Sequence, residues 1–365
     1  MKILNISSSS GIGGREMLVM TLSNALKKAG HNVRLLTAPH TWLSQQKFSG
    51  YTLPMKKYID LYSIYNIGKI LKEFQPEIVH IYFISDIWLV VPAVKLFSPK
   101  TKIFLLRSMQ SSPMKDFTRT KLFAGLNKII TMSDFITEDF LSKTNVLPEK
   151  VQTIYIGVDP QDFEGPAKQN QPNILKQKYN LDKETLLVGL VGRIDKAKGQ
   201  DKFIEAIKQI CEQTTKNVKF FIVGSAEKGA GEDYVNTLKA RATKLHIYDK
   251  VIFTGFRSDI PDIMNALDIA VFPSKNEAFG LVVIEAMAAS RAVIGFNRGA
   301  FPEIILDQKT GITTDYEHSA LSKGILELIE DDKKRKKFAK AGRKRVIEKF
   351  TLDETITKFI ELYTS

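Results

Sequence analysis

The sequence predicts an α/β protein built from two Rossmann-like, doubly wound domains. The chain has 365 residues, which is more than one hydrophobic core usually organises. Short apolar runs alternate with segments of helical periodicity, and this alternation is typical of buried parallel strands joined by helices. Near the middle, residues 164–181 hold a Gly-Pro pair and a stretch rich in Gln and Asn. We therefore predict a linker there, between domains at 1–163 and 182–350.

The first domain begins with a short apolar strand and continues through alternating helices and strands. Its first helix is expected to end at Gly30, a residue type that commonly terminates helices, and its second to end before Pro76. We expect strands at 3–6, 33–37, 78–82, 103–106, 128–132 and 151–154. We expect helices at 15–29, 64–74 and 89–96.

After the linker, predicted strands again alternate with predicted helices in the second domain. We expect strands at 186–191, 218–223, 251–254, 269–273 and 292–296, helices at 201–212 and 233–245, and a last amphipathic helix at 351–363. In open parallel sheets, ligands bind outside the carboxyl ends of the strands. With two such sheets facing each other, we expect the ligand in the cleft between them.

The composition narrows the classes of partner and the compartment. Lysine and arginine exceed the acids by 13 charges, which favours anionic partners. No nucleic-acid motif accompanies this charge, so we predict no nucleic-acid partner. Cys211 is the only cysteine, so neither a disulfide nor a cysteine-based zinc site is expected, and we interpret it as core packing. The N-terminus becomes polar too soon for a signal peptide and no apolar run reaches membrane-spanning length, so we expect a cytoplasmic protein.

Three loops that follow predicted strands carry the candidate chemistry. The first is Gly11-Ile12-Gly13-Gly14-Arg15-Glu16, which opens the first helix. Glycines at a helix N-terminus let backbone N–H groups approach an anion closely, and we single out Gly13 and Gly14. The spacing is not the dinucleotide-binding Gly-x-Gly-x-x-Gly pattern. A plain tight turn explains the glycines equally well.

The second loop, Gly192–Gly199, leaves the first strand of the second domain. Arg193 offers a planar fork of donors and Lys198 a point charge five residues later. Together they could neutralise a diphosphate. Two exposed loop cations would be the alternative interpretation, but the position after a strand end favours a ligand.

The third loop, Ser274–Ala286, follows another strand end and carries two glutamates eight residues apart, Glu277 and Glu285. Glu277 precedes a predicted helix whose first turn would include Phe279, Gly280 and Leu281, where N–H groups lack helical partners. Glu285 lies further along that helix among apolar residues, where a carboxylate needs hydrogen-bond partners such as sugar or ribose hydroxyls. Taken singly, Glu285 is better explained as a solvated surface residue.

Together these motifs resemble the family 4 retaining glycosyltransferases, whose two-Rossmann-domain architecture is called GT-B. The resemblance is carried by Gly13–Glu16, Gly192–Gly199 and the Glu277/Glu285 pair in this order, with support from 156–159, 253–256 and 299–303. It covers nearly the whole chain. It implies a retaining, metal-independent hexosyltransferase that moves a sugar from a nucleotide-diphosphate donor to a glycan or lipid-linked acceptor, as in bacterial cell-surface polysaccharide or lipopolysaccharide synthesis.

The resemblance also implies a role for each candidate residue. Arg193 and Lys198 would hold the donor diphosphate and stabilise the departing nucleotide, and Glu277 would bind donor-sugar hydroxyls near the reacting carbon. Gly13 and Gly14 would contact the phosphate or the sugar, and the N–H groups of Phe279, Gly280 and Leu281 would contact the transferred sugar. Glu285 would bind the ribose, and Arg257 would lie beside the base. No metal or cofactor is implied. Residues 351–365 would cross back and pack on the first domain.

One departure from the family pattern concerns the acceptor side. Many members carry a histidine after the fourth strand of the first domain, where this chain reads Leu105-Leu106-Arg107-Ser108-Met109-Gln110. We interpret Arg107 as a residue that contacts the acceptor or the sugar instead. His80, which ends a predicted strand, is a second acceptor-side candidate.

Two further questions stay open at this point. Residues 42–74 mix aromatics with lysines, a composition suited to an acceptor-binding surface or to the anionic inner face of a membrane; ordinary core aromatics with surface lysines are the alternative. The missing histidine also leaves room for a GT-B protein that binds a nucleotide sugar without transferring it. A nicotinamide oxidoreductase is disfavoured because its glycine fingerprint is absent.

Overall fold

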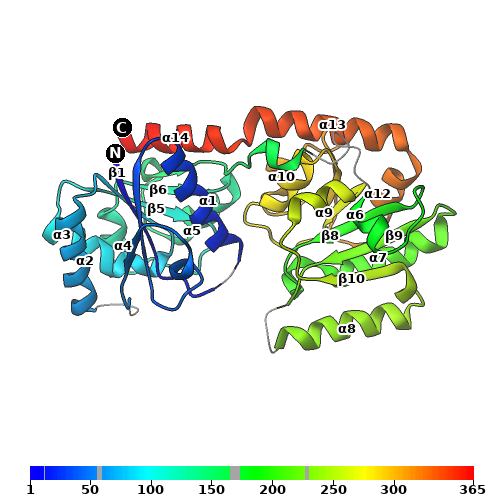
Figure 1. The fold of residues 1–365 in the computed structure, drawn as a ribbon, viewed down its shortest axis with the longest axis horizontal. Coiled ribbons are helices and arrows are strands. Elements are labelled where there is room, and N and C mark those ends of the chain that lie inside the picture. The colour runs from blue at the N-terminus through cyan, green and yellow to red at the C-terminus, as the bar shows by residue number, and fades with distance from the viewer. Residues whose placement is uncertain (12, 56–59, 165–172, 227–229) are drawn as a thin grey trace. The chain divides into compact units, whose positions relative to one another are not determined.

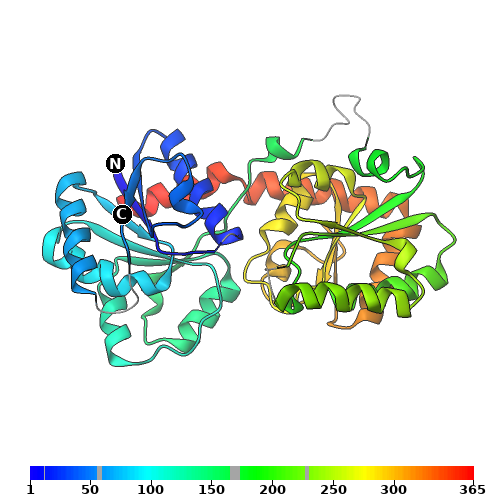
Figure 2. The same ribbon diagram turned by 60° about the horizontal axis from the view of Figure 1, so that its bottom comes forward.

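The computed structural model describes the chain except for residues 12, 56–59, 165–172 and 227–229. It divides into two compact units, one formed by residues 1–155 with 352–365 and the other by 156–351. Each unit is a fully parallel sheet packed with helices (Figures 1 and 2). The predicted fold class, two doubly wound α/β domains, is therefore confirmed.

The first unit contains a seven-stranded sheet in the order β3-β2-β1-β4-β5-β6-β7. Its strands are β1 Lys2–Ser7, β2 Asn32–Thr37, β3 Gly50–Thr52, β4 Ile78–Ile81, β5 Lys102–Arg107, β6 Lys128–Thr131 and β7 Val151–Thr153. Its helices are α1 Gly14–Lys28, α2 Leu61–Phe74, α3 Ile87–Phe97, α4 Phe117–Ala124, α5 Asp134–Lys143 and α14 Leu352–Thr364. Six of these strands were predicted to within a residue or two, and only the three-residue β3 was not.

The second unit contains a six-stranded sheet in the order β10-β9-β8-β11-β12-β13. Its strands are β8 Leu186–Val191, β9 Val218–Val223, β10 Val251–Gly255, β11 Ile269–Phe272, β12 Ala292–Phe296 and β13 Ile312–Thr314. Its helices are α6 Ile174–Lys178, α7 Gln200–Gln213, α8 Ala230–Lys244, α9 Ile260–Ala266, α10 Leu281–Ala288, α11 Phe301–Ile304, α12 His318–Glu330 and α13 Asp332–Lys349. Three strands have the predicted bounds, and only β13 was not predicted.

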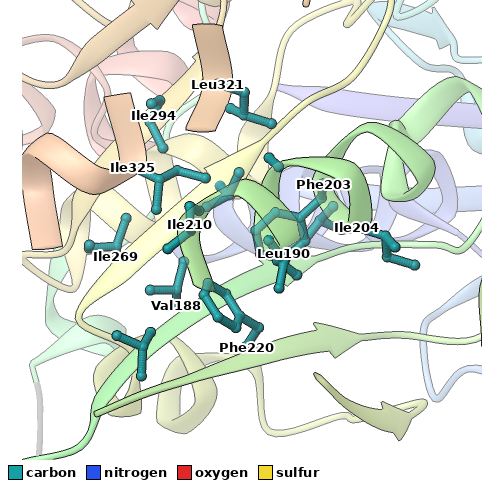
Figure 3. Close-up of a cluster of buried hydrophobic side chains, with 14 of the residues drawn as sticks. Val188, Leu190, Phe203, Ile204, Ile210, Phe220, Ile269, Ile294, Leu321 and Ile325 are labelled. Carbon is teal, nitrogen blue, oxygen red and sulfur yellow. The ribbon is translucent and has the colours of Figure 1, made fainter. Parts of the chain in front are cut away.

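Both faces of the second sheet are covered. On one face, side chains of β8 point toward α7, where Phe203 and Ile204 are fully buried (Figure 3). On the other face, a Cβ built on Gly189 would lie 2.6 Å from the side chain of Leu267, directly after α9. Because a side chain at position 189 has no room, β8 and the residues after α9 approach each other closely. This packing fixes the strand whose carboxyl end leads into the Arg193 loop.

Side-chain caps define where several helices begin. The carboxylate of Asp60 accepts the N–H of Ser63 at the start of α2, and the Ser133 hydroxyl accepts the N–H of Ile136 at the start of α5. Asp331 does the same for α13. Each cap satisfies an N–H group that has no partner inside its helix.

The chain passes from the first unit to the second at Tyr155/Ile156 and returns at Thr351/Leu352. The N–H of Val158 donates to the carbonyl of Phe350 at 3.0 Å, which ties residues 156–158 to the end of α13. Within the predicted linker, residues 165–172 lie outside the described part of the chain, and the residues that follow enter α6, which packs on α9. The backbone pairing to Phe350, rather than the polar composition of 164–181, marks where the second unit begins.

The last helix, α14, belongs to the first unit and lies beside α1 (Figure 1). The Thr355 hydroxyl donates to the carbonyl of Tyr155 at 3.0 Å, and the ammonium of Lys102 donates to the carbonyl of Tyr363 at 3.1 Å. Phe359 and Tyr363 are buried against the sheet. The first unit is therefore completed by a segment that follows the whole of the second unit in the chain.

Candidate functional site

At two positions, the backbone of the loop between β8 and α7 has a conformation that strongly favours glycine. Gly192 has a φ of 153° and Gly199 a φ of 73°, values that side chains other than glycine rarely tolerate. A Cβ on Gly199 would also lie 2.0 Å from the carbonyl oxygen of Pro273. The loop therefore rests directly on the segment that follows β11. The N–H of Lys275 donates to the carbonyl of Ala197 at 2.9 Å and joins the same two segments.

Asp195 organises this loop, and we did not predict its role. Its carboxylate accepts the N–H of Ala197 at 2.9 Å and the Nε of Arg193 at 2.9 Å. Its position two residues after Arg193, at the start of a turn, is a capping signal that could have revealed this. The buried amide of Gln200 donates to the carbonyl of Arg193 at 2.9 Å. The Arg193 side chain itself is 56% exposed, so most of its guanidinium surface can meet a ligand.

The structure brings two predicted site residues into direct contact. The ammonium of Lys198 donates to Oε2 of Glu277 at 2.7 Å, although 79 positions separate them in the chain. Their side chains are 29% and 15% exposed, so the pair is partly desolvated and still reachable from solvent. A cation and a carboxylate held this way offer an anion site and a hydroxyl acceptor side by side.

The backbone of Glu277 is held by the loop that follows β12. The N–H of Ala300 donates to the carbonyl of Glu277 at 3.0 Å. A Cβ on Gly299, whose φ is 59°, would lie 2.5 Å from that carbonyl oxygen. The segment 299–303 supported the family resemblance, and its structural role is to position Glu277.

The helix α10 begins directly after this loop. Gly280 is its N-cap with a φ of 95°, and it has no side chain that could accept the N–H groups of the first turn. The N–H of Val283 donates to the carbonyl of Gly280 at 2.9 Å, whereas the N–H groups of Leu281 and Val282 have no backbone acceptor among the described residues. Phe279 is 2% exposed and packs edge-on against Phe350 at 6.5 Å. Phe279 therefore anchors the helix start through its ring, while the backbone of the turn is available to an oxygen-rich ligand.

Glu285 lies one turn into α10 and is half-buried between the fully buried Ile284 and Ala286. Burial raises the pKa of its carboxyl to about 7. Among the residues that the structure describes, its carboxylate makes no hydrogen bond or ion pair. A carboxylate without partners in a desolvated position favours ligands that donate hydrogen bonds, such as ribose hydroxyls.

The raised pKa of Glu285 predicts a stability that depends on pH. In the unfolded chain this carboxyl titrates near 4.5 and in the folded protein near 7, so the folded state loses stability as pH rises between these values. Glu285→Gln should leave the free energy of unfolding nearly unchanged at pH 4.5 and raise it by up to about 3 kcal/mol above pH 7. Urea titrations of both proteins from pH 4.5 to 8.5 measure the difference. A difference that stays constant over this range would contradict the assignment.

Arg257 lies after β10 and is held locally. Its Nε donates to Oδ1 of Asp259 at 2.7 Å, and its Nη2 contacts Oδ2 of the same carboxylate. The Asp259 hydrogen bond raises the pKa of Arg257. Among the described residues, Arg257 makes no hydrogen bond or ion pair with the loops of Lys198 and Glu277, so its place beside a base stays a prediction.

The glycine loop of the first unit is built around Glu16. The Ser9 hydroxyl donates to the buried carboxylate of Glu16, which lies beneath the loop. Gly13 has an extended φ of −172°, which any residue could adopt. A Cβ on Gly14 would meet no atom within 4 Å. Packing inside the described structure therefore does not require glycine at position 14, as expected where a ligand approaches the backbone.

The structure separates the two acceptor-side candidates. His80 is fully buried; Tyr363 of α14 hydrogen-bonds its Nδ1 at 2.5 Å, and the rings of Tyr82 and Phe359 pack against it. Burial lowers the pKa of its ring to about 3, so the ring is neutral. This burial leaves no surface for an acceptor, and we correct the assignment of His80 to a structural role. Arg107 ends β5 and is 7% exposed.

The described residues contain neither a candidate metal site nor a helix that could cross a membrane. No group of three or more His, Cys, Asp or Glu side chains is arranged to hold a metal ion in the part of the chain that the structure describes. Within the same residues, no helix combines the length and apolarity needed to cross a bilayer.

Proteins with similar sequences align with this chain over 65% to 99% of its length. A glycosyltransferase of uncharacterized specificity from Methanocaldococcus jannaschii is 27% identical over 65% of this chain and 59% of its own length. The N-acetyl-α-D-glucosaminyl L-malate synthase of Bacillus anthracis is 21% identical over 99% of this chain and 96% of its own. The capsular polysaccharide glycosyltransferase CapM of Staphylococcus aureus is 25% identical over 81% and 87%.

Solved structures share the fold. A glycosyltransferase from Rickettsia africae aligns with a TM-score of 0.88 at 22% identity, covering 99% of this chain and 97% of that one. HepE from Anabaena, in complex with UDP and glucose, aligns with a TM-score of 0.84 at 21% identity over 100% and 99%.

Family models match both halves of the chain. Residues 12–162 match the model of glycosyltransferase family 4, and residues 172–345 match that of the glycosyl transferases group 1. The second match contains the Lys198–Glu277 pair, and the first contains the glycine loop. The chain therefore belongs to the group 1, family 4 glycosyltransferases of GT-B fold.

Proposed function

We propose that this protein is a retaining glycosyltransferase that uses a nucleotide-diphosphate sugar and a glycan or lipid-linked acceptor. The observation that carries the proposal is the contact between Lys198 and Glu277. The Lys198 ammonium lies 2.7 Å from the Glu277 carboxylate. We propose that the cation binds the diphosphate and that the carboxylate binds the sugar hydroxyls. These are the two charges that must flank the bond between phosphate and sugar.

In this proposal the diphosphate replaces Glu277 as the partner of Lys198. Arg193 adds a second cation, and the first-turn N–H groups of α10 point at the transferred sugar. Stabilising the negative charge that grows on the leaving nucleotide accelerates departure. Glu277, released from Lys198, accepts hydrogen bonds from the sugar hydroxyls. The donor phosphate takes the proton of the acceptor hydroxyl as it attacks the same face, so the configuration is retained. The cationic side chains stand in for a metal ion.

Names of relatives give the proposal its biological class. CapM is named for capsular polysaccharide biosynthesis, and a relative from Rhizobium meliloti is named a lipopolysaccharide core mannosyltransferase. The Bacillus anthracis relative is instead named for L-malate. The polysaccharide names support a cell-surface glycan or a lipid-linked precursor as acceptor, on the cytoplasmic side of a membrane. The HepE complex makes UDP the first nucleotide to test.

A thermal-shift panel of nucleoside diphosphates and their sugars, with and without EDTA, tests the donor site. A ligand at one hundred times its Kd adds about 2.7 kcal/mol to the folded state. We expect one nucleotide class to raise Tm with no effect of EDTA. A folded sample that responds to none would overturn the proposal. The anomeric configuration of the product, read by NMR, then decides between retention and inversion.

A non-catalytic nucleotide-sugar-binding protein is the alternative, because the acceptor-side histidine of many family members is absent. Such a protein would respond in the thermal-shift panel in the same way. It would not convert the donor to free nucleotide, with or without acceptors. Slow donor hydrolysis without acceptor, measured by release of nucleoside diphosphate, therefore separates the two functions.

We also propose that an exposed face of α2 rests on an anionic membrane surface. Leu61, Tyr62 and Tyr65 are 76%, 67% and 54% exposed. The ammonium of Lys69 lies 4.7 Å from the centre of the Tyr65 ring. Apolar and aromatic side chains interleaved with lysines are typical of helices that bind the headgroup region of anionic bilayers.

Sedimentation with phosphatidylglycerol vesicles at physiological salt tests this surface. We expect a bound fraction that falls at high salt and with neutral vesicles. Replacing Leu61, Tyr62 and Tyr65 together by serine should abolish it. Leu147→Ser, at an apolar residue 59% exposed elsewhere in the same unit, is the matched control. Equal sedimentation of the triple variant and the parent would refute this surface.

A further inference from the structure

Charged side chains gather at one edge of the first sheet. β1 lies between β2 and β4, so the chain winds in opposite directions from β1, and the crevice at such a switch point commonly binds ligands. Ser8 follows β1 and Asp86 follows β4, and the N–H and hydroxyl of Ser8 donate to the carboxylate of Asp86 at 2.9 and 2.5 Å. Arg107 ends the neighbouring strand β5.

Arg107 is a buried cation without a carboxylate contact in the described structure. Its Nη2 donates to the carbonyl of Met109 at 3.1 Å and to the hydroxyl of Ser111 at 2.9 Å, while its buried Nε has no hydrogen-bond partner. The negative charge of Asp139 acts on Arg107, but the Asp139 carboxylate already pairs with Lys143 and accepts the N–H of Ser111. Burying a guanidinium is unfavourable unless an anion pairs with it.

Arg15 supplies a second guanidinium to the same place. The carbonyl of Phe83, whose ring lies beside Arg15, accepts the N–H of Asp86 at 2.9 Å. Burial has the largest effect on the pKa of Asp86 and of Arg107, and beside it the positive charge of Arg15 lowers both. The Nε of Arg15 lies 3.4 Å from the carboxylate of Glu16 and makes no hydrogen bond, and its guanidinium lies 4.9 Å from the centre of the Phe83 ring. The Glu16 carboxylate also accepts a hydrogen bond from the Ser9 hydroxyl, so Arg15 is not its only partner. The side chain of Arg15 is 30% exposed and can reach a ligand.

Asp86 does not cancel these two charges. Burial raises the pKa of its carboxyl to about 6, so a fraction of it is protonated near neutral pH, and both of its oxygens already accept hydrogen bonds from Ser8. Arg15 therefore acts on a carboxylate whose oxygens already accept hydrogen bonds, and Arg107 hydrogen-bonds only to the Met109 carbonyl and the Ser111 hydroxyl among the described residues. The local balance of charge and of unused donors favours an anion.

We propose that Arg107 and Arg15 bind an anionic group of the acceptor, a carboxylate or a phosphate adjoining the hydroxyl that receives the sugar. This inference rests on the proposed function, since it names the chemical class of that enzyme's acceptor. The planar donor fork of arginine matches both anions in bidentate geometry. An acidic sugar or a phosphorylated acceptor fits this site, and a neutral acceptor leaves Arg107 without an anionic partner and Arg15 with Glu16 alone.

Three probes with the same ring hydroxyls test the proposal on the full chain: methyl glucoside, methyl glucuronide and methyl glucoside 6-phosphate. Binding is measured by ligand-observed NMR, with the nucleotide from the thermal-shift panel at saturation and without nucleotide. We expect at least one charged probe to bind about tenfold or more tightly than the neutral one. Preference for the glucuronide identifies a carboxylate, and preference for the phosphate ester identifies a phosphate.

Variants assign the preference to residues. Arg107→Gln and Arg15→Gln should each reduce it to within about threefold of the neutral probe, while Arg107→Lys keeps part of it because the charge remains without the fork. Arg119→Gln, at a cation paired with Asp116 in the same unit, is the matched control. If Arg107→Gln lowers Tm, the test rests on the probe preference of Arg15→Gln, because the Arg15 side chain is partly exposed.

Two outcomes overturn the inference. One is equal binding of charged and neutral probes by the parent protein. The other is an Arg107→Gln variant that keeps the preference, or that weakens nucleotide binding rather than probe binding. If no nucleotide binds at all, the proposed function fails, and the nucleotide-free measurements still decide whether Arg107 holds an anion.

Discussion

Lys198→Ala is expected to lower the rate of sugar transfer by about 10²–10³-fold, the loss typical when one donor that stabilises a developing negative charge is removed. Its ammonium donates to the Glu277 carboxylate at 2.7 Å, so the cation is already positioned for a diphosphate. The variant should also lose affinity for a nucleoside diphosphate much more than for the nucleoside. Isothermal titration with both ligands, together with transfer kinetics, measures these effects.

Lys196→Ala is the control for this prediction. Lys196 is exposed in the same short turn and carries the same charge, and its side chain makes no hydrogen bond or ion pair with the described residues. It should change nucleotide affinity by no more than about twofold, since an exposed charge is screened by water and salt. Equal effects of the two substitutions would mean that the loop acts through general charge and not through Lys198. Arg193→Ala should resemble Lys198→Ala in direction.

Glu277→Ala is the second substitution with a large expected effect. Transfer should fall by about 10³-fold or more, because the sugar loses the carboxylate that orients it beside the leaving phosphate. Binding of the nucleoside diphosphate alone should weaken only modestly, because in the proposed mechanism the diphosphate is held by Lys198 and Arg193 and not by Glu277. Single-turnover transfer kinetics and titration with the diphosphate give the two numbers.

Glu277→Gln distinguishes charge from hydrogen bonding at this position. The amide keeps one acceptor oxygen and the shape of the side chain, so residual activity above that of the alanine variant would assign part of the role to a neutral hydrogen bond. Glu330→Gln, at an exposed acid 3.5 Å from Lys216 in the same unit, controls for the loss of a negative charge. Full transfer activity in Glu277→Ala would remove this residue from the proposed mechanism.

The approximate place of the donor-site residues could be predicted because it depends on local rules. Parallel strands end at one edge of a sheet, so Lys198 after β8 and Glu277 after β11 had to lie near each other. Their direct contact could not be predicted. It depends on the absence of a side chain at Gly199, which lets the loop rest on the carbonyl of Pro273. Such close approaches are set by tertiary packing and leave no periodic signal.

The assignment of His80 failed for a different reason. The sequence shows that this residue ends a strand, but not which later segment covers it. The ring is covered by Tyr363 and Phe359, from a helix that begins more than 270 positions further along the chain. The three-residue strands β3 and β13 were not predicted because neither forms a buried apolar run: β3 is Gly-Tyr-Thr, and β13 has only Ile312 buried. Long apolar strands such as β8 and β9 were predicted to the residue.

The closing position of α14 has a consequence for synthesis on the ribosome. Domains usually fold in the order in which they emerge, but here the sheet of the first unit emerges with the ring of His80 and the face of Phe104 uncovered. Tyr363, which packs on both, is translated only after the whole second unit. The second unit can therefore finish folding before the first unit does. Until α14 has been synthesised, the first unit exposes the apolar surface that Tyr363 later covers. A nascent chain stalled before residue 352 should recruit chaperones to this strip and release them once α14 is complete.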